Sequence, residues 1–578
     1  MTKSYTVLFL LLFVFTAFAA KIEQKHVRNL TGNEVLPATN NSSVLHKASA
    51  LDGTPLGETV YDYGTNSVMG RMLARSTNGV HAAFMKRYPD ATVNREATYD
   101  FFDFAGSAFF GNFTLDPGNY TGWANVANTT GDAAVEVNHG GGVSIWLDEG
   151  EAFYTFTQDT VFNDFGMTLF PRVDAQGDVI VATANDNASA AGFVVSSDHG
   201  ASWTFGLYPN VSAGFWGSAE VELLVDPTNT SHLKSAVAIT DTTGAPDGLY
   251  VGESNDGGAT FTYTEVVAED FMDNGYLPFV ENFAQISNVF DGTGNLHVVF
   301  NGYGVDATQD TAIVTPVMYM NDRDMTLMQV DAWGMDTAKA AQAATYFPGN
   351  GIGNAYPSVA ASEDGNVVVV VWQQPEFDAD GNIIFAYDAS GDSTSGLMAT
   401  DIYMNYSTDG GKTWNTPQWV AGNAGESDVF PSLAAKVSVD GDNYVVDLLY
   451  MYDPAPGVSL FGEGSNPLVT WLYKSIVVTA TGIDDGGVVA NSYELQQNYP
   501  NPFNPVTTIK YSLEKAGNVT LDVYNVLGAK VATLVNGEKM SAGAHEVTFD
   551  ASNLASGIYY YKLSADGFEA TKKMVLVK

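Results

Sequence analysis

A repeated segment constrains this chain more than any other feature of its sequence. Each copy carries an aromatic residue, a small residue or proline, a polar residue and an apolar residue, followed by a turn and a run of alternating β-forming residues. Copies begin at Tyr356, Phe430, Trp123, Phe170 and Phe283, with degenerate ones near Asn66 and Trp216. Because one such unit cannot bury its apolar faces alone, neighbouring copies must stack against each other.

A second motif recurs within these units, with the pattern Ser-x-Asp-x-Gly-x-(Ser or Thr)-(Trp or Phe). It occupies residues 196–203, 254–261 and 407–414. The aspartate can accept hydrogen bonds from a turn, the glycine allows positive φ, and the aromatic ring can fill an apolar gap beside the turn. We therefore expect a structural hairpin latch, not a catalytic one, formed by Asp198, Trp203, Asp256, Phe261, Asp409 and Trp414.

These three segments resemble the Asp-box, or BNR repeat, of sialidase-superfamily β-propellers, in which the motif joins the third and fourth strands of a blade. The resemblance implies an all-β propeller of four-stranded blades packed radially. We place it at residues 56–482 with seven blades, or alternatively six because the copies near Asn66 and Trp216 are degenerate. Residues 469–479 are a candidate for the strand that closes the ring.

The C-terminal part carries the most specific text, Asn498-Tyr-Pro-Asn-Pro-Phe-Asn-Pro505, followed by several short alternating runs separated by turns. The alternation predicts a small antiparallel β-sandwich. The segment resembles the type A C-terminal sorting domain of type IX secretion cargo. The resemblance implies an Ig-like sandwich over residues 493–578, joined by a linker at 483–492, with the type IX machinery as its partner. It also implies a Gram-negative, Bacteroidota-like source and a secreted or cell-surface location.

The N-terminal end has the pattern of an export signal. Lys3, an apolar run and the small residues Ala17 and Ala19 predict a signal peptide over residues 1–20, and residues 21–55 have the composition of an extended leader. No later apolar run is long enough to predict a membrane span. The chain has no cysteine, so its stability must come from burial and strand pairing.

The charge balance limits the partners. The chain carries 25 basic and 66 acidic residues, a formal net charge of -41. Such a field repels phosphate backbones, so we expect no nucleic-acid partner and a solvated, monomeric protein. No cofactor is expected. Ca²⁺ is the weaker alternative, because residues 378–382 imitate the start of a calcium loop but lack its later ligands, and a hairpin turn is favoured there.

We expect any catalytic residues on the first strand of each unit, because ligands of propellers bind where these strands meet at the central channel. Sialidase chemistry would require three arginines around a carboxylate, and Arg71, Arg172 and Arg323 are the candidates among seven arginines. The Arg-Ile-Pro element of that family is absent. Other glycoside hydrolysis needs two carboxylates, for which Glu220, Glu222 and Asp174 are weak candidates, as is Arg172 for a catalytic role.

The leading functional interpretation is a secreted or surface-attached propeller that binds extracellular glycan or protein without catalysis. The alternative is an extracellular glycoside hydrolase, sialidase-like or other, or a polysaccharide lyase. Converging carboxylates or three clustered arginines in one deep pocket would favour catalysis, and aromatic residues around the channel would favour binding.

Overall fold

The computed structural model describes most of the chain between residues 52 and 578. The expected signal peptide with Ala17 and Ala19, and the expected linker 483–492, lie outside the described residues. The described residues are 52–65, 69–87, 95–186, 191–208, 215–217, 221–241, 248–267, 285–301, 304–306, 311–314, 316–325, 327–332, 334, 336, 338–339, 342–343, 351, 353–378, 381–385, 397–422, 426–440, 443–454, 457–458, 468–479, 494–495, 498, 501, 503–513, 517–526, 529–540, 543–565 and 568–578.

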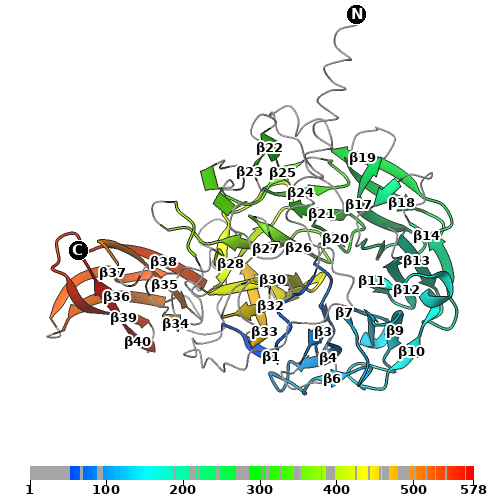
Figure 1. Cartoon of the computed structure of the whole chain (residues 1–578), viewed down its shortest axis with the longest axis horizontal. Coiled ribbons are helices and arrows are strands. Elements are labelled where there is room, and N and C mark those ends of the chain that lie inside the picture. Colours follow the sequence, from blue (N-terminus) through cyan, green and yellow to red (C-terminus); the bar gives the residue numbers. More distant parts are fainter. Residues whose placement is uncertain are drawn as a thin grey trace, which may run out of the picture.

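Antiparallel strands form blades that surround a common axis (Figure 1), and the last two blades are joined into one nine-stranded sheet by a parallel bridge between Thr400 and Ser427. The all-β propeller is confirmed, and the described residues contain seven blades, not six. From the inner strand outward, blade 1 contains β2 (Leu73–Arg75), β3 (Gly79–Lys86) and β4 (Glu96–Asp103) with β5 (Ala108–Phe109) and β6 (Phe113–Thr114). Blade 2 contains β7 (Gly122–Asn128), β8 (Ala134–His139), β9 (Val143–Leu147) and β10 (Thr157–Asp159), and blade 3 contains β11 (Leu169–Gln176), β12 (Val179–Asn185), β13 (Ala191–Ser196) and β14 (Thr204–Leu207). Blade 4 contains β15 (Phe215–Gly217) with β16 (Leu224–Val225), then β17 (Leu233–Asp241), β18 (Gly248–Ser254) and β19 (Thr262–Val267).

Blades 5 to 7 continue the same order and complete the ring. They comprise β20 (Ile286–Phe290), β21 (Leu296–Asn301), β24 (Val317–Asn321) and β25 (Met328–Gln329); β26 (Ala355–Ser362), β27 (Val368–Pro375), β28 (Thr400–Ser407) and β29 (Gln418–Ala421); and β30 (Ser427–Leu433), β32 (Asn443–Asp453), β33 (Val469–Thr479) and β1 (Thr54–Thr59). A small ribbon of β22 (Gly304–Asp306) and β23 (Thr311–Val314) belongs to the blade 5 segment, and β31 (Lys436–Asp440) pairs with β32.

The ring is closed by a strand that the sequence analysis did not identify. β33, the expected closing strand, is the third strand of blade 7, and its free edge pairs antiparallel with β1. Thr54 faces Tyr473 and Thr59 faces Val469 in this register. The outer strand of the last blade therefore comes from the N-terminal side of the chain and begins inside the segment expected to be a leader. This pairing ties together positions more than 400 residues apart in sequence.

The aromatic residue of the repeated motif adopts a strained backbone conformation. In four blades it has positive φ and lies in a β-bulge at the start of the inner strand, where the register with the second strand shifts. Positive φ in a bulky residue costs about 1–3 kcal/mol and persists only where the surroundings enforce it. The four residues are Trp123 (φ 54°), Phe170 (φ 50°), Tyr356 (φ 52°) and Phe430 (φ 56°).

The bulge places the polar residue of the motif against the next blade. Side chains at this position hydrogen-bond the neighbouring inner strand through its backbone: Ser432 Oγ accepts from Met72 N (3.0 Å) and donates to Gly70 O (2.8 Å), Ser358 Oγ accepts from Leu433 N (3.0 Å), Ser287 Oγ accepts from Val359 N (3.3 Å), and Asn125 Nδ2 donates to Pro171 O (3.2 Å). In blade 5 this residue is Ser287, so the copy aligned at Phe283 in the sequence analysis was shifted by two residues.

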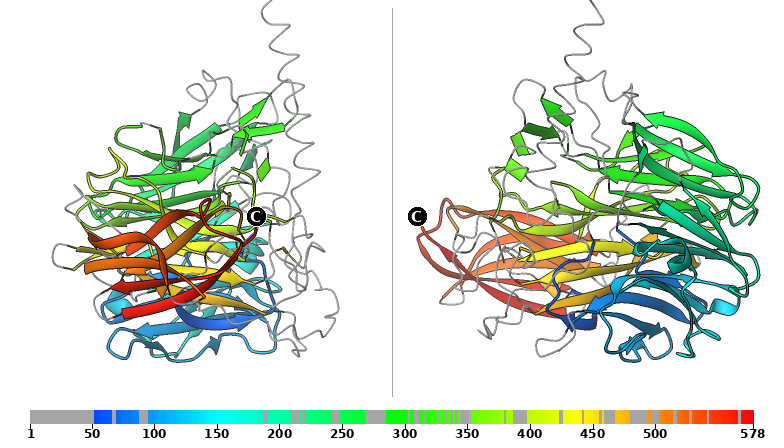
Figure 2. Two further views of the ribbon diagram at one scale, coloured as in Figure 1. Left: turned by 90° about the vertical axis from the view of Figure 1, so that its left-hand side faces the viewer. Right: turned by 45° about the vertical axis from the view of Figure 1, so that its right-hand side comes forward.

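The C-terminal domain is a two-sheet sandwich that lies beside the ring, not on its axis (Figure 2). One sheet contains β34 (Glu494–Leu495), β35 (Val506–Leu513) and β38 (Gly543–Asp550); the other contains β37 (Lys530–Met540), β36 (Gly517–Asn525), β39 (Gly557–Ala565) and β40 (Phe568–Leu576). Alternate side chains of both sheets form one core that includes Ile509, Leu521 and Tyr561. In the part of the chain that the structure describes, no helix has the length and apolar character needed to span a bilayer.

The closure between blades 7 and 1 is open to a direct test. Ser432→Ala removes an acceptor and a donor at once and leaves Met72 N and Gly70 O buried without this partner, so we expect a loss of about 1–3 kcal/mol of unfolding free energy. Ser144→Ala is the matched control, because Ser144 accepts from the exposed Gln158; it should change stability by less than about 0.5 kcal/mol. Equal effects of the two substitutions in denaturant titrations would contradict the account.

Candidate functional site

A buried guanidinium occupies the axis of the propeller. Arg71 precedes the inner strand of blade 1, and its Nε lies 3.1 Å from Oε1 of Glu222 in blade 4. Its Nη1 donates to the carbonyls of Val359 (2.6 Å) and Leu433 (3.4 Å), and its Nη2 donates to the carbonyl of Asn288. One side chain thus bridges the inner strands of blades 4 to 7, and the hub is filled at this level.

The carboxylates proposed from sequence lie at this hub. Glu222 is buried, pairs with Arg71 through Oε1 and accepts from Asn288 N (3.3 Å) through Oε2. Asp174, on β11, accepts from Val225 N at 2.8 Å. Burial above all, with the nearby Glu222, raises the pKa of Asp174 to about 7. Both groups are engaged in joining blades, and Glu220 lies outside the described residues.

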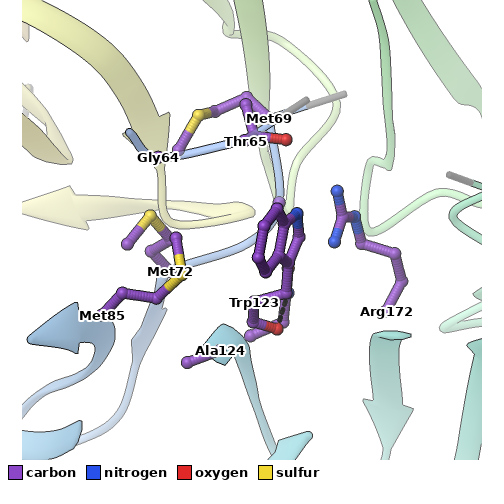
Figure 3. Close-up of a pocket in the computed structure, with 10 residues that line it drawn as sticks. Gly64, Thr65, Met69, Met72, Met85, Trp123, Ala124 and Arg172 are labelled. Carbon is purple, nitrogen blue, oxygen red and sulfur yellow. Dashed lines mark hydrogen bonds between the residues drawn. The ribbon is translucent and has the colours of Figure 1, made fainter. Parts of the chain in front are cut away.

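A small cavity of about 10 Å³, enough for roughly one water-sized group, lies beside the axis between blades 1, 2 and 3 (Figure 3). Trp123 and Asn125 line it from β7 and Arg172 lines it from β11, with the guanidinium turned toward the indole ring. Arg172 also donates to the carbonyl of Pro171 at 3.0 Å. Two buried polar atoms of this pocket, Trp123 Nε1 and Asn125 Oδ1, form no hydrogen bond within the described part of the chain.

Cationic and aromatic groups hold the indole ring in place. The guanidinium of Arg95 lies 4.3 Å from the ring centroid of Trp123 and also packs on Tyr61 and Tyr120. His139 accepts from Phe170 N at 2.8 Å, and burial, with Arg95 and Arg172, holds its pKa well below the usual value, so the imidazole is neutral. The sequence analysis missed Arg95 and His139, because both lie outside the repeated motif.

A second small cavity, of about 20 Å³, lies between blades 6 and 7 and the segment that leads into blade 1; we call the end of the axis beside these two cavities the mouth. Tyr356 and Phe430, the strained aromatic residues of those blades, line it with Gln373, and their ring centroids are 4.8 Å apart. Residues 60–65, which we call the mouth segment, contribute Asp62 to this pocket and Gly64 to the first one. A β-carbon on Gly64 would lie 2.7 Å from Phe430 Cγ, so the close approach of this segment requires glycine.

The arginines suggested for a carboxylate clamp do not converge. Arg71 is engaged at the hub and Arg172 lines the first pocket, whereas Arg323 donates to Thr293 Oγ1 (2.8 Å) in an exposed turn of blade 5. The structure instead brings Arg95 and Arg172 to the same imidazole, that of His139.

The three segments with the Ser-x-Asp-x-Gly pattern connect the third and fourth strands of blades 3, 4 and 6 and share one geometry. Asp198 accepts from Ser196 Oγ, Ser202 N and Ser202 Oγ at 2.8, 2.8 and 2.6 Å. Asp256 and Asp409 make the equivalent bonds at 2.6–2.9 Å. These bonds hold the pKa of all three carboxyls below its usual value, against the effect of burial at Asp409.

The aromatic residue of each of these segments contacts the preceding blade. Trp203 Nε1 donates to Asp159 of blade 2 at 2.8 Å. The ring centroid of Phe261 lies 4.7 Å from that of Tyr208 of blade 3, and the ring centroids of Trp414 and Tyr319, of blade 5, are also 4.7 Å apart. These segments therefore join neighbouring blades at the rim of the propeller, away from the mouth.

The calcium-loop imitation forms part of a tight turn. Asp378 N donates to Asn382 O at 2.9 Å, its carboxylate accepts from Asn382 N at 2.8 Å, and Gly381 has φ of 80°. Among the described residues, no three His, Asp or Glu side chains are grouped as a metal site would require.

Comparison with known families identifies the C-terminal domain. Residues 497–578 match the family described as the secretion system C-terminal sorting domain. The chain is therefore a propeller protein exported by type IX secretion, the pathway of Bacteroidota, to the cell surface or the extracellular space. No curated protein sequence matches the chain.

Solved structures of similar fold differ widely in their described activities. They include the phage phi92 endosialidase (11% identity, TM-score 0.39, 84% of this chain and 75% of that one), a fungal alcohol oxidase of the AA5 family in complex with copper (8%, 0.36, 90% and 99%), and an endo-arabinase from Bacteroides thetaiotaomicron (14%, 0.28, 54% and 91%). Similarity at this level says nothing about the chemistry of this chain.

Replacing Arg71 alone should strongly destabilise the folded protein. Arg71→Met leaves Glu222 buried without its counter-charge, so we expect a loss of about 3–5 kcal/mol of unfolding free energy. The double variant Arg71→Met/Glu222→Gln should recover part of this loss. Additive effects of the two substitutions in denaturant titrations would show that Arg71 and Glu222 are not coupled.

The hub should also make stability depend on pH. The pKa of Asp174 rises from its ordinary 3.8 to about 7 on folding, so its contribution is fully present below pH 4 and is lost as pH rises through about 7. Asp174→Asn should remove this component, and the difference in melting temperature between the two proteins should therefore change across that window. A constant difference from pH 4 to pH 8 would contradict the assignment.

Proposed function

We propose that this secreted propeller binds an extracellular glycan at its channel mouth, with a sugar hydroxyl in the pocket of Trp123, and that it does not cleave the glycan. The observation that carries the proposal is the pair of buried polar atoms, Trp123 Nε1 and Asn125 Oδ1, that lack hydrogen bonds in the described part of the chain. Each such atom costs about 1–3 kcal/mol, which a ligand can recover.

A hydroxyl group suits these two atoms. It can accept from the indole N–H and donate to the amide oxygen at the same time, whereas a carbonyl or an ammonium group satisfies only one of the two. Arg172 adds further donors at the same pocket. The buried rings of Trp123, Tyr356 and Phe430 form the apolar walls of the two cavities, and small-ligand sites combine such walls with a few polar groups.

The size of the cavity and the net charge of the chain limit the kinds of glycan that can bind. The cavity, at about 10 Å³, holds roughly one water-sized group, so we expect it to take a single hydroxyl at the end of a chain and not a whole sugar ring. The net charge of -41 opposes approach of polyanions, which favours an uncharged glycan.

The absence of cleavage is part of the proposal because the hub carboxylates have other roles. Glu222 is paired with Arg71, and Asp174 accepts a backbone hydrogen bond between blades 3 and 4. The usual glycoside hydrolysis requires two carboxyl groups at the scissile bond, one as the acid and the other as a base for water or as the nucleophile.

A conservative substitution tests the pocket. Trp123→Phe keeps an aromatic ring and removes the indole N–H, so we expect affinity for the bound glycan to fall about tenfold, as for the loss of one buried hydrogen bond. Trp203→Phe is the matched control, since it removes an indole N–H that donates to Asp159 at the rim. Binding of the full chain to a glycan array, followed by calorimetry on the strongest neutral glycan, provides the measurement.

Two results would contradict the proposal. The first is equal affinity of Trp123→Phe and Trp203→Phe, with both proteins folded by circular dichroism. The second is release of reducing sugar from the bound glycan that stops in Asp174→Asn or Glu222→Gln, which would favour the hydrolase alternative.

A further inference from the structure

A lysine of the sorting domain is inserted into the outer edge of blade 6. Lys510 lies on β35, and its Nζ is 3.0 Å from Oδ2 of Asp401, on β28 of the propeller. The same Nζ lies 5.1 Å from the ring centroid of Trp419, on β29. The side chain of Asp401 is 2% exposed and that of Lys510 is 26% exposed, so the ion pair is largely removed from water. The two domains are therefore in contact through a specific polar site.

The receiving residues are built around a glycine. Gly422 follows β29, and a β-carbon there would lie 1.7 Å from Asp401 Oδ1 and 2.8 Å from Trp419 Nε1. Neither of these two atoms has a hydrogen-bond partner among the described residues. We call Asp401, Trp419 and Gly422 the blade 6 recess. It combines a buried carboxylate, the face of an indole ring and unused hydrogen-bonding capacity.

No lysine or arginine of the described part of the propeller forms an ion pair with this carboxylate. Lys474, the resident lysine nearby, donates to Asp52 Oδ2 and Val420 O, both at 2.7 Å. Within the described chain, Lys510 is the ion-pair partner of Asp401. Burial would lower the pKa of Lys510, but Asp401 above all, with Tyr403 and Glu376, raises it, which keeps the ammonium charged.

We propose that the blade 6 recess is a binding site for a primary ammonium group, which Lys510 fills in the intact chain. Displacement of the sorting domain then opens the recess to a lysine side chain of another protein. A carboxylate oxygen together with an aromatic face suits a compact ammonium on an alkyl stem. The described residues around it are not grouped as a metal site would require. The proposal is independent of glycan binding, which is placed at the channel mouth.

Chemical rescue tests the recess in the full-length protein. Lys510→Ala removes three methylene groups and the ammonium, so n-propylammonium has the size and charge to replace them. We expect saturable binding of n-propylammonium to Lys510→Ala by calorimetry, together with a rise in melting temperature. Wild-type protein and Lys562→Ala, which breaks an exposed ion pair with Glu569 in the same domain, should show neither response.

Two further experiments test whether the site recognises the positive charge of the ligand. Asp401→Asn in the Lys510→Ala background should weaken n-propylammonium binding by more than about tenfold, because a buried charge partner is lost. n-Propanol should not bind. The proposal is overturned if n-propanol binds as well as n-propylammonium, if Asp401→Asn has no effect, or if wild-type protein responds like Lys510→Ala.

A second variant covers the case in which Lys510→Ala does not fold. Lys510→Met keeps a chain of similar length in the recess without the charge. Its loss of stability should largely disappear when it is combined with Asp401→Asn, since the two groups are coupled. Strictly additive effects of Lys510→Met and Asp401→Asn would overturn the proposal.

Discussion

The structure depends on a polar ring at the hub, where side chains tie each inner strand to the inner strand of the next blade. Ser432 and Ser358 receive backbone N–H groups from the adjoining blades, and Arg71 donates across the axis to three carbonyls and to Glu222. Apolar burial between blades is non-directional and would tolerate small rotations of each sheet, whereas buried hydrogen bonds do not. The ring therefore specifies which blade follows which, and the closure by β1 completes it on the outside.

A filled axis changes where a ligand can bind. Because the hub carboxylates are engaged in holding blades together, the site that we propose uses two buried polar atoms beside the axis, Trp123 Nε1 and Asn125 Oδ1, that form no hydrogen bond in the described part of the chain. The same bulges that direct polar residues inward hold Trp123, Phe170, Tyr356 and Phe430 at positive φ around this mouth. Strain that recurs in four blades at one level of the molecule persists because the packing around it enforces the conformation, and the binding site that we propose would share this sequence motif.

Local sequence patterns were sufficient to predict the architecture but not the contacts between residues far apart in the sequence. Alternating runs and repeated turns predicted the blades and the sandwich, because strands and hairpins depend on neighbours in sequence. The pairing of β1 with β33 could not be predicted, since β1 is short and its partner lies at the other end of the propeller. The same reason hid the role of Glu222: its partner Arg71 is 151 residues away, so an inward carboxylate suggested catalysis. The contact of Lys510 with Asp401 joins two domains and has no local signal.

Native-state hydrogen exchange tests the hub most directly. The amides of Met72, Val225, Val359 and Leu433 donate to side chains of neighbouring blades. If the polar ring holds the propeller together, these four amides exchange only by global unfolding, with one shared free energy of opening equal to that of the whole propeller. Exchange of the four at different free energies, each matching the local opening of its own blade, would contradict the account.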